Sequence, residues 1–514
     1  MLSEPALLTR LLDRGLGDRP EVPALVSATT SMSWRALDAA SNRCAASLLD
    51  LGLQKGDRVA SLMPNRTALI VHYLACIKAG LVATPLNYRY TAPEIDHALD
   101  VSGASVLLAH AERHEDVARS RLAGDLPLGV IEYGNADGRG MSFESLLERE
   151  SAGFSPAALA PDDPAVIFFT SGSTGKPKGV THTAESLGWM LASAAAGIGL
   201  GAVDVMLPGS SLSHVAGFVW SMTALSVGAR LVVPRTLDGD ELLPLFRSQR
   251  PTVLSILPST LFTLVRDHNA THEDFGSLRL CRAAGDKVAS ELEREFMALA
   301  GFPIDEGYGM TEIGFALITP PSGPFKLGSV GRPMPGFTML IRDEAGAEVP
   351  TGTEGCIWVR SRSCMSGYWN DKAATEAAIR DGWLDTGDEM TADADGYLWF
   401  HGRKKQMIVH DGSNICPQEV EDALLAHPAV ENAGVVGVHD LLHGENVRAY
   451  VTLKQGAPRP TVQEMIRLAR SQVGYKAPEE IIILDEIPLN PTGKVDRIAL
   501  KQLADVHLAG ASSA

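Results

Sequence analysis

Short apolar runs alternate with amphipathic segments over roughly the first 330 residues. Residues 58–63 are typical of a buried strand, residues 68–79 have helical spacing, and residues 82–86 are again strand-like. This rhythm predicts parallel sheets flanked by helices. From about residue 338 to 400 the pattern changes to short strands separated by turn signals, such as Asp393-Ala394-Asp395-Gly396, which predicts a small β-rich subdomain.

A charged turn, Gly402-Arg403-Lys404-Lys405, precedes the last part of the chain. There, two helical patterns (417–426 and 461–472) and three strand-like runs (435–438, 448–453 and 481–484) predict a compact α+β module. We therefore expect an α/β protein with two domains. Residues 1–402 would hold two parallel-type α/β sheet subdomains and the small β-rich subdomain, and residues 403–514 would form the α+β domain.

Composition narrows the class of protein. The chain has 514 residues, 45% of them hydrophobic, and a net charge of −17, which argues against broad capture of nucleic acid or anionic membrane. Any polyanionic ligand must therefore meet local positive charge. The six cysteines are scattered without a Cys-x-x-Cys pair, the amino terminus lacks a signal-peptide pattern, and the uncharged stretch 190–203 is too short to span a membrane. We expect a cytoplasmic protein.

Residues 170–180, Thr-Ser-Gly-Ser-Thr-Gly-Lys-Pro-Lys-Gly-Val, follow the apolar run 165–169. Glycines let successive backbone N–H groups converge on one point, and hydroxyl and ammonium groups complete a cradle for an anion. The segment is not a Walker A loop, because Pro177 follows Lys176. We predict a phosphate-binding loop, with a surface linker as the alternative.

Three further motifs carry candidate chemistry. Glu312, in Gly-Tyr-Gly-Met-Thr-Glu (307–312), has the carboxylate that Mg²⁺ favours beside phosphates, with a helix start as the alternative. Asp388, in Leu-Asp-Thr-Gly-Asp (384–388), would accept hydrogen bonds from ribose hydroxyls, or it caps a turn. Lys494, in Pro-Thr-Gly-Lys (491–494), would neutralise charge at a reacting phosphate, or it is a surface lysine.

In this order, the motifs resemble the core motifs of the adenylate-forming superfamily, which includes acyl-CoA ligases, luciferases and peptide-synthetase adenylation domains. The resemblance spans essentially the whole chain, and residues 56–59, 85–87 and 102–104 are similar to the acyl-CoA ligase branch. It implies that a carboxylate attacks the α-phosphate of ATP, giving acyl-adenylate and pyrophosphate. A thiol, usually that of CoA, then displaces AMP.

The resemblance also implies a nucleotide site. The loop would wrap the β- and γ-phosphates, Glu312 and Thr170 would hold Mg²⁺, and Lys494 would bridge the substrate carboxylate and the α-phosphate. Tyr308 would stack near adenine, and Asp388 and Arg403 would hold the ribose. The implied ATP-binding residues are Thr170, Ser171, Gly172, Ser173, Thr174, Gly175, Lys178, Ala284, Gly285, Asp286, Glu306, Gly307, Tyr308, Thr311, Asp388, Arg403 and Lys494, and the implied catalytic residues are Lys494, Glu312, Thr170 and His214.

Lys405 matches the family's hinge position, which implies a mobile C-terminal domain. Rotation about it would withdraw Lys494 and present the segment around Gly412 to the thiol. The implied CoA-binding residues are Gly412, Ser413, Tyr475 and Lys476. The chain departs from its relatives at Asp411, which would narrow a pantetheine path, and at Asp286-Lys287, where many ligases read Ala-Pro.

Residues 213–218 match the family segment that lines the acyl pocket. Amino-acid-activating relatives carry an aspartate near this segment to pair with the α-ammonium group, and this chain has none there, so the acid is expected not to be an amino acid. Small residues leave room for an aryl or a medium-to-long aliphatic group. The implied acyl-binding residues are His214, Val215, Gly217, Ala283, Gly309, Met310 and Gly314, with a core histidine as the alternative for His214.

Two alternatives from other classes stay open: an enzyme that loads a carrier protein instead of CoA, and a catalytically silent ligand-binding paralogue. The expected partners are a small-molecule carboxylic acid, ATP, CoA and Mg²⁺, with no nucleic acid and no membrane span, and a homodimer remains open. The pairs His110/His114 and His439/His443 have one-turn helical spacing that suits zinc but lack a third ligand, so we expect them to be solvated.

Overall fold

The computed structural model describes residues 2–134, 141–150, 153–170, 177–285, 288, 290–321, 323–403, 407–454, 456, 458–488 and 495–511. The side chains of residues 290, 291, 403 and 505–511 are not described.

Within the described residues, one eight-stranded sheet carries the strand that leads into the predicted phosphate loop. Its parallel strands from β8 to β7 are joined at one edge by the antiparallel β9 and β19. Thr170 and Lys178 are paired across β8 and β9, so these two strands flank the loop segment 171–176. In spatial order the strands are β19 (Gly367–Tyr368), β9 (Lys178–Thr183), β8 (Pro164–Thr170), β4 (Val82–Pro85), β3 (Arg58–Leu62), β5 (Val106–His110), β6 (Val130–Tyr133) and β7 (Met141–Ser142).

A second sheet of the described residues has nine strands. The neighbouring strands β14, β13, β12, β10, β11 and β1 are parallel. Strands β15 and β16 at one edge and β2 at the other are antiparallel. In spatial order they are β16 (Arg332–Pro333), β15 (Gly314–Ile318), β14 (Asp305–Met310), β13 (Leu280–Ala284), β12 (Val253–Ile256), β10 (Val205–Gly209), β11 (Arg230–Val232), β1 (Pro23–Val26) and β2 (Ser31–Ser33).

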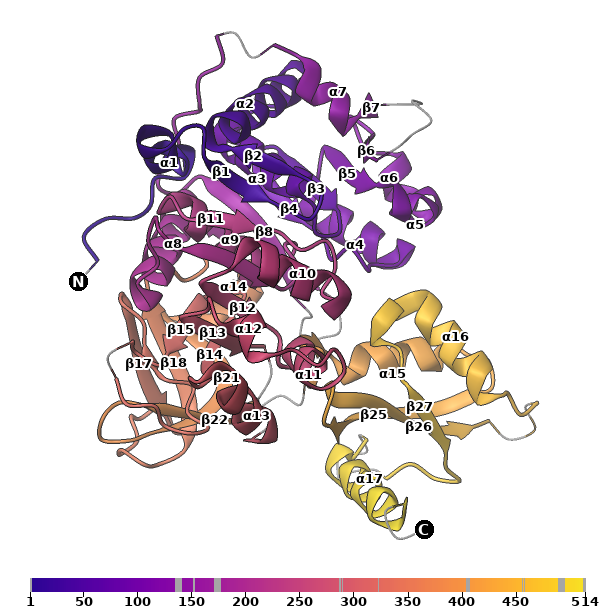
Figure 1. Ribbon diagram of the computed structural model, residues 1–514. Coiled ribbons are helices and arrows are strands. Elements are labelled where there is room, and N and C mark those ends of the chain that lie inside the picture. The colour runs from indigo at the N-terminus through magenta and orange to yellow at the C-terminus, as the bar shows by residue number, and fades with distance from the viewer. Residues whose placement is uncertain are drawn as a thin grey trace.

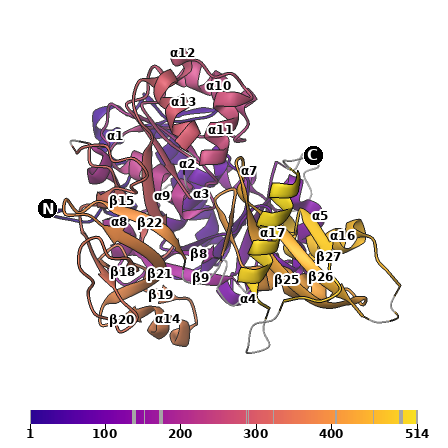
Figure 2. The same cartoon turned by 90° about the horizontal axis from the view of Figure 1, so that it is seen from below.

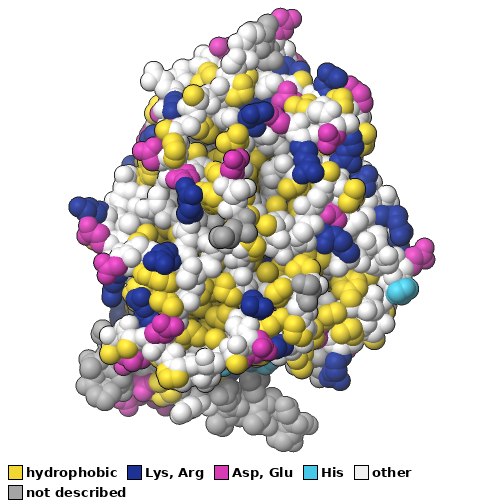
Figure 3. Space-filling view, turned by 90° about the vertical axis from the view of Figure 1, so that its left-hand side faces the viewer, with side chains coloured by type: hydrophobic (Ala, Val, Ile, Leu, Met, Phe, Trp, Pro, Cys, Tyr) yellow, Lys and Arg dark blue, Asp and Glu magenta, His cyan; other side chains and the backbone are white. Residues whose placement is uncertain are grey.

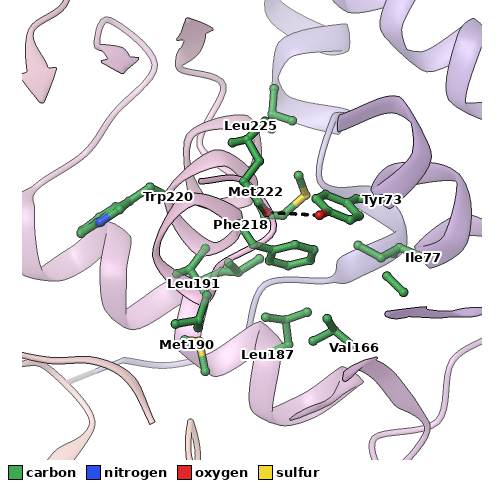
Figure 4. Close-up of a cluster of buried hydrophobic side chains, with 14 of the residues drawn as sticks. Tyr73, Ile77, Val166, Leu187, Met190, Leu191, Phe218, Trp220, Met222 and Leu225 are labelled. Carbon is green, nitrogen blue, oxygen red and sulfur yellow. Dashed lines mark hydrogen bonds between the residues drawn. The ribbon is translucent and has the colours of Figure 1, made fainter. Parts of the chain in front are cut away.

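Helices of the first 300 residues pack around these two sheets (Figure 1). Helix α3 is buried on all sides, because its residues face both a sheet and other helices. Figure 4 shows the centre of this core, where Phe218 of α9 packs 4.8 Å from the Tyr73 ring and Tyr73 donates a hydrogen bond to the Leu212 carbonyl. The helices are α1 (Asp13–Asp18), α2 (Trp34–Asp50), α3 (Thr67–Ala79), α4 (Ala92–Ser102), α5 (His114–Arg119), α6 (Arg121–Gly124), α7 (Phe143–Glu148), α8 (Ala184–Ile198), α9 (Val215–Ser226), α10 (Gly239–Gln249), α11 (Pro258–Arg266), α12 (His272–Phe275) and α13 (Ser290–Ala300), with 3₁₀ turns η1 (Leu8–Arg10) and η2 (Ala111–Arg113).

The β-rich subdomain is antiparallel, as the turn-rich pattern after residue 338 predicts. Its strands are β17 (Phe337–Arg342), β18 (Gly355–Ser361), β21 (Trp383–Ala392), β20 (Ile379–Arg380) and β22 (Leu398–Arg403), next to helix α14 (Lys372–Ala378).

The residues from Ile408 onward form a separate α+β unit with its own sheet. Two hydrophobic clusters contain only residues of this part of the chain. The views in Figures 1 and 2 place this unit at one side of the molecule. Its elements are β23 (Ile408–His410), β24 (Ser413–Ile415), α15 (Pro417–Leu425), β25 (Val430–Asp440), β26 (Gly444–Leu453), α16 (Val462–Val473), η3 (Gly474–Lys476), β27 (Glu480–Ile483) and α17 (Arg497–Ala511).

The predicted α/β fold class is therefore confirmed, with antiparallel edges that the alternating pattern did not reveal. No helix of the described residues is long and apolar enough to cross a membrane. On the face shown in Figure 3, side chains of both charge signs are interspersed with hydrophobic ones.

Candidate functional site

A cavity of about 550 Å³ lies where the large sheets meet the C-terminal unit. It opens at the carboxyl ends of several parallel strands, because residues at or just after the ends of β8, β10, β12 and β13 line it. This edge is where open α/β sheets commonly bind ligands. The C-terminal unit supplies the remaining wall through residues 411–414, 442–443 and 475–476.

The structure brings many of the predicted residues to this one cavity. Its lining includes Thr170, His214, Val215, Ala284, Gly285, Gly309, Met310, Thr311, Gly314, Gly412, Ser413, Tyr475 and Lys476. The described residues Lys178, Gly217, Ala283, Glu306, Gly307, Tyr308, Glu312 and Asp388 are outside the lining. Ser171, Gly172, Ser173, Thr174, Gly175, Asp286, Lys405 and Lys494 lie outside the described residues, as does the side chain of Arg403.

Glu312 lies next to β19, which pairs with β9, one of the two strands that flank the predicted phosphate loop in sequence. Its carboxylate accepts a hydrogen bond from the Tyr368 hydroxyl at 3.0 Å, and the Lys178 ammonium lies 4.9 Å from the Tyr368 ring centroid. His182 donates from Nε2 to the Thr311 carbonyl at 2.8 Å, which fixes the backbone just before Glu312. The buried carboxylate of Glu312 and the hydroxyls of Thr170 and Thr311, which line the cavity, are hard oxygen donors of the kind that suits Mg²⁺.

Asp388 is fully buried rather than open to a ribose. It accepts a hydrogen bond of 2.6 Å from the Tyr308 hydroxyl, and its own backbone N–H donates to the Thr386 hydroxyl. Tyr308 is itself 8% exposed and packs near Phe400. Neither side chain lines the cavity, so the contacts of Tyr308 with adenine and of Asp388 with ribose stay predictions.

Several predicted glycines have a packing reason. A Cβ on Gly307 would lie 2.0 Å from the guanidinium of Arg282, which forms a buried ion pair of 2.9 Å with Asp305. A Cβ on Gly217 would lie 2.3 Å from the Ser211 carbonyl oxygen. Gly217 was expected to line the acyl pocket. Its place in the structure instead explains why helix α9 can approach the Ser211 backbone.

His214 presents its ring to the cavity. The side chain is exposed to the cavity, and desolvation by the surrounding protein lowers its pKa. Nδ1 accepts a hydrogen bond from the Ala216 N–H at 3.3 Å. The neutral ring therefore carries its proton on Nε2 and can donate it to an oxygen in the cavity.

A two-residue hairpin brings the C-terminal unit into the cavity. Asp411 and Gly412 join β23 to β24 with φ of 49° and 69°, and His410 pairs with Ser413 across the turn. Asp-Gly is a favoured pair for such tight turns, because both positions need positive φ. A Cβ on Gly285 would lie only 3.5 Å from Gly412 Cα, so the turn reaches the backbone after β13.

The predicted CoA contacts of Lys476 are not available in this arrangement. Its side chain is almost fully buried, with the ammonium 2.6 Å from Glu419 Oε1 and 2.9 Å from Glu94 Oε1. Burial alone would lower the pKa of Lys476, but the two carboxylates raise it well above its usual value. A CoA phosphate would have to displace one of them.

Residues that sequence reasoning did not assign also line the cavity. Arg89 stacks 3.9 Å from the Tyr475 ring centroid, and Asn87 donates a hydrogen bond of 3.2 Å to the Tyr475 hydroxyl. The polar run 87–90 after the buried strand β4 was the available signal, because residues after parallel strands gather at one sheet edge.

Neither histidine pair lies on one helix, and the expectation that all four are solvated is wrong for His110. His110 ends β5 and is buried, whereas His114 begins α5, and His439 lies in β25. His443 is a cavity residue whose Nδ1 lies 2.9 Å from Asp411 Oδ1.

Comparison with known proteins places this geometry in a family. The AMP-binding enzyme model matches residues 12–369, and the AMP-binding enzyme C-terminal domain model matches residues 419–494. The chain is 32% identical to a feruloyl-CoA synthase from Amycolatopsis sp (93% of this chain, 94% of the relative). It is 33% identical to an indoleacetate–CoA ligase from Aromatoleum aromaticum (96% and 98%) and 30% identical to the fatty acid–[acyl-carrier-protein] ligase ScoC from Streptomyces coeruleorubidus (94% and 93%).

Solved structures agree along the whole chain. The amide bond synthetase McbA from Marinactinospora thermotolerans matches with a TM-score of 0.88 at 27% identity (97% of this chain, 99% of that chain). A double mutant of the Bacillus subtilis o-succinylbenzoate CoA synthetase MenE, bound to its product analogue OSB-NCoA, matches with 0.85 at 28% (97% and 98%). ATP-bound MatB from Rhodopseudomonas palustris matches with 0.73 at 30% (97% and 99%).

AMP-binding enzymes of this kind use ATP and CoA, and both parts of the chain match them in the same order. The protein therefore belongs to the AMP-binding enzymes, the adenylate-forming superfamily, within its acyl-CoA ligase branch.

Proposed function

We propose that this chain joins a carboxylic acid to CoA in two steps. First, a carboxylate oxygen attacks the α-phosphorus of ATP, the bond to the β-phosphate breaks, and pyrophosphate leaves. The CoA sulfur then attacks the acyl carbon, the bond between that carbon and the phosphate oxygen breaks, and AMP leaves. The observation that carries the proposal is the shared cavity, whose walls combine Thr170 and His214 with the Gly412 turn of the C-terminal unit.

The residues would divide the work between the steps. His214 would donate from Nε2 to the substrate carboxylate and orient it, and residues 170–178 would hold the β- and γ-phosphates. Mg²⁺, when bound to Glu312, Thr170 and Thr311, would neutralise phosphate charge. Lys494 would approach the α-phosphate in the first step, and the Gly412 turn would border the path of the thiol in the second.

The arrangement of the C-terminal unit supports the second step. The TM-score is 0.85 with the product-analogue complex of the CoA synthetase but 0.73 with ATP-bound MatB. The sequence identity runs the other way, at 28% and 30%. Both comparisons cover nearly the whole chain, and apo MatB matches with the same TM-score of 0.73, so we attribute the gap to a different placement of the C-terminal unit in MatB. We infer two domains, residues 1–402 and 403–514, that rotate about a hinge at Lys405.

For the acid, we propose an aryl or a medium-to-long aliphatic carboxylic acid. The lining around His214 contains Val215, Ala216, Met310 and Phe315. Among the described lining residues the one carboxylate is Asp411, which belongs to the C-terminal hairpin and lies 2.9 Å from His443 Nδ1. Relatives named for feruloyl and indoleacetate substrates favour the aryl class.

The test is a screen of purified protein with ATP, CoA and a panel of fatty, aryl and dicarboxylic acids, monitored for AMP release. Absence of acid-dependent AMP or pyrophosphate release across the panel would sink the proposal and favour a silent ligand-binding paralogue. The relatives named as a carrier-protein ligase and an amide bond synthetase support a second candidate, transfer to another acceptor. Comparing CoA, a carrier protein and an amine as acceptors in the same screen separates these functions.

Lys494→Ala tests the division between the steps. We expect loss of adenylate formation, because the charge at the α-phosphate is no longer neutralised, while thioester formation from preformed acyl-adenylate continues. Equal loss of both reactions would contradict the two-step use of the C-terminal unit.

A further inference from the structure

A buried group of three charges joins the C-terminal unit to helix α4. The Lys476 ammonium of η3 donates to Glu419 of α15 at 2.6 Å and lies 2.9 Å from Glu94 of α4. The three side chains are 3%, 10% and 6% exposed. Lys476 and Glu419 belong to one unit and Glu94 to the other, so only the Lys476–Glu94 contact depends on how the two units are placed.

Glu94 is held ready for this contact. Its second carboxylate oxygen, Oε2, accepts hydrogen bonds from the N–H and hydroxyl of Thr91, forming the capping box of α4. Oε1 is thereby left facing Lys476. The Thr91 hydroxyl also lies 3.2 Å from the Gln472 carbonyl, and a Cβ on Gly474 would lie 3.3–3.4 Å from atoms of Thr91, Arg89 and Glu94.

The charges make this docking specific for one orientation. Removing Lys476, Glu419 and Glu94 from water is costly, and only close pairing offsets that cost. If the C-terminal unit rotates, Lys476 keeps Glu419 but leaves Glu94. In the orientation shown here, the same unit brings the Gly412 turn against Gly285.

We propose that Glu94 is a positioning residue for acyl transfer: through Lys476 it holds the C-terminal unit in the orientation that borders the cavity with the Gly412 turn. The inference rests on the two-step function proposed above. Glu94 touches no reacting group in this arrangement and acts only through the placement of the other unit.

Glu94→Gln is the sharp test, because glutamine retains the capping box but removes the charge that faces Lys476. We expect the rate of acyl transfer to fall about 10-fold or more, since one side of a buried ion pair is lost, while the rate of pyrophosphate release in adenylation changes less than about twofold. Lys326→Gln is the matched control. Lys326 also lies between two carboxylates, at 2.5 Å from Asp393 and 2.7 Å from Asp395, but all three belong to the N-terminal part.

A double-mutant cycle tests whether Glu94 acts through Lys476. In a Lys476→Met background, Glu94→Gln should produce little further slowing of transfer. The proposal is overturned if Glu94→Gln slows both half-reactions equally, if it slows transfer no more than Lys326→Gln, or if its effect persists in full in the Lys476→Met protein.

Hydrogen exchange gives a readout that needs no turnover. In Glu94→Gln, but not in Lys326→Gln, backbone amides of residues 87–95 and 472–477 should exchange faster, because the two segments no longer hold together. Unchanged exchange there would overturn the docking role even if no acid were activated. Failure of the acid screen with the unaltered protein would instead defeat the proposed function.

Discussion

Replacing Gly412 by alanine tests whether the C-terminal hairpin borders the path of the acceptor. A Cβ on this residue would lie 2.6 Å from Leu257 Cδ2, which belongs to the other unit. Gly412 also has a φ of 69°, which L side chains rarely adopt. The substitution thus introduces two costs with different consequences.

The backbone cost, about 1 kcal/mol, is present wherever the C-terminal unit lies, so it lowers stability without favouring one orientation. The clash with Leu257 exists only in the arrangement seen here. Overpacking of this kind costs about 1–3 kcal/mol, because the end of the Leu257 side chain must move. At 1.36 kcal/mol for each tenfold change, acyl transfer should slow about 5- to 150-fold.

The two half-reactions are measured separately, by pyrophosphate release and by thioester formation from preformed acyl-adenylate, with an acid that the unaltered protein accepts. Gly456→Ala is the matched control, since Gly456 has a φ of 79° and no atom within 4 Å of a Cβ. Adding Leu257→Ala to Gly412→Ala should restore transfer to the rate of Leu257→Ala alone. If Gly412→Ala slows transfer no more than Gly456→Ala does, the hairpin does not act as proposed.

Two further predictions concern the nucleotide wall and pH. Tyr308→Phe removes the donor to the buried Asp388 carboxylate, and a hydrogen bond to a charged group is worth about 1.5–3 kcal/mol, so the free energy of unfolding measured with denaturant should fall by about that amount. Because Asp388 is the expected ribose ligand, the KM for ATP should also rise, and an unchanged KM would show that this pair is remote from the nucleotide. Burial lowers the pKa of His72 to about 3 and of His182 to about 4, so both are neutral in the folded state while the unfolded chain takes up protons below pH 6.5. The free energy of unfolding is therefore highest above pH 6.5 and falls as the pH is lowered, by about 2 kcal/mol for each histidine at pH 5. Denaturant unfolding at pH 7.5 and 5 measures this loss; His72→Gln should remove about half of it, and an unchanged pH dependence in that variant would contradict the assignment.

The elements that the periodicity of the sequence placed mostly agree with the structure to within a few residues, because buried strands and amphipathic helices repeat locally. Helix α3 was expected at 68–79 and occupies Thr67–Ala79, and β26 was expected at 448–453 but extends back to Gly444. The cavity lining around Thr170, His214 and Gly412 also follows motifs that are local in sequence.

Local periodicity and motifs did not predict contacts between segments that are distant in the sequence. Lys476 stands in a short polar segment that gives no sign of burial, and its partner Glu94 is 382 positions earlier. The burial of Asp388 under Tyr308 likewise depends on how the β-rich subdomain packs on β14. His110 was expected to be solvated, but it ends strand β5 and is buried.

The hairpin at Asp411 and Gly412 belongs to a unit with its own hydrophobic core, whereas the ring of His214 comes from the larger sheets. Under the proposed function, changes at a few positions of the small unit would alter the acceptor of the acyl group and leave the choice of acid to the larger unit. Interchange of the small units between such enzymes should transplant acceptor preference as a module.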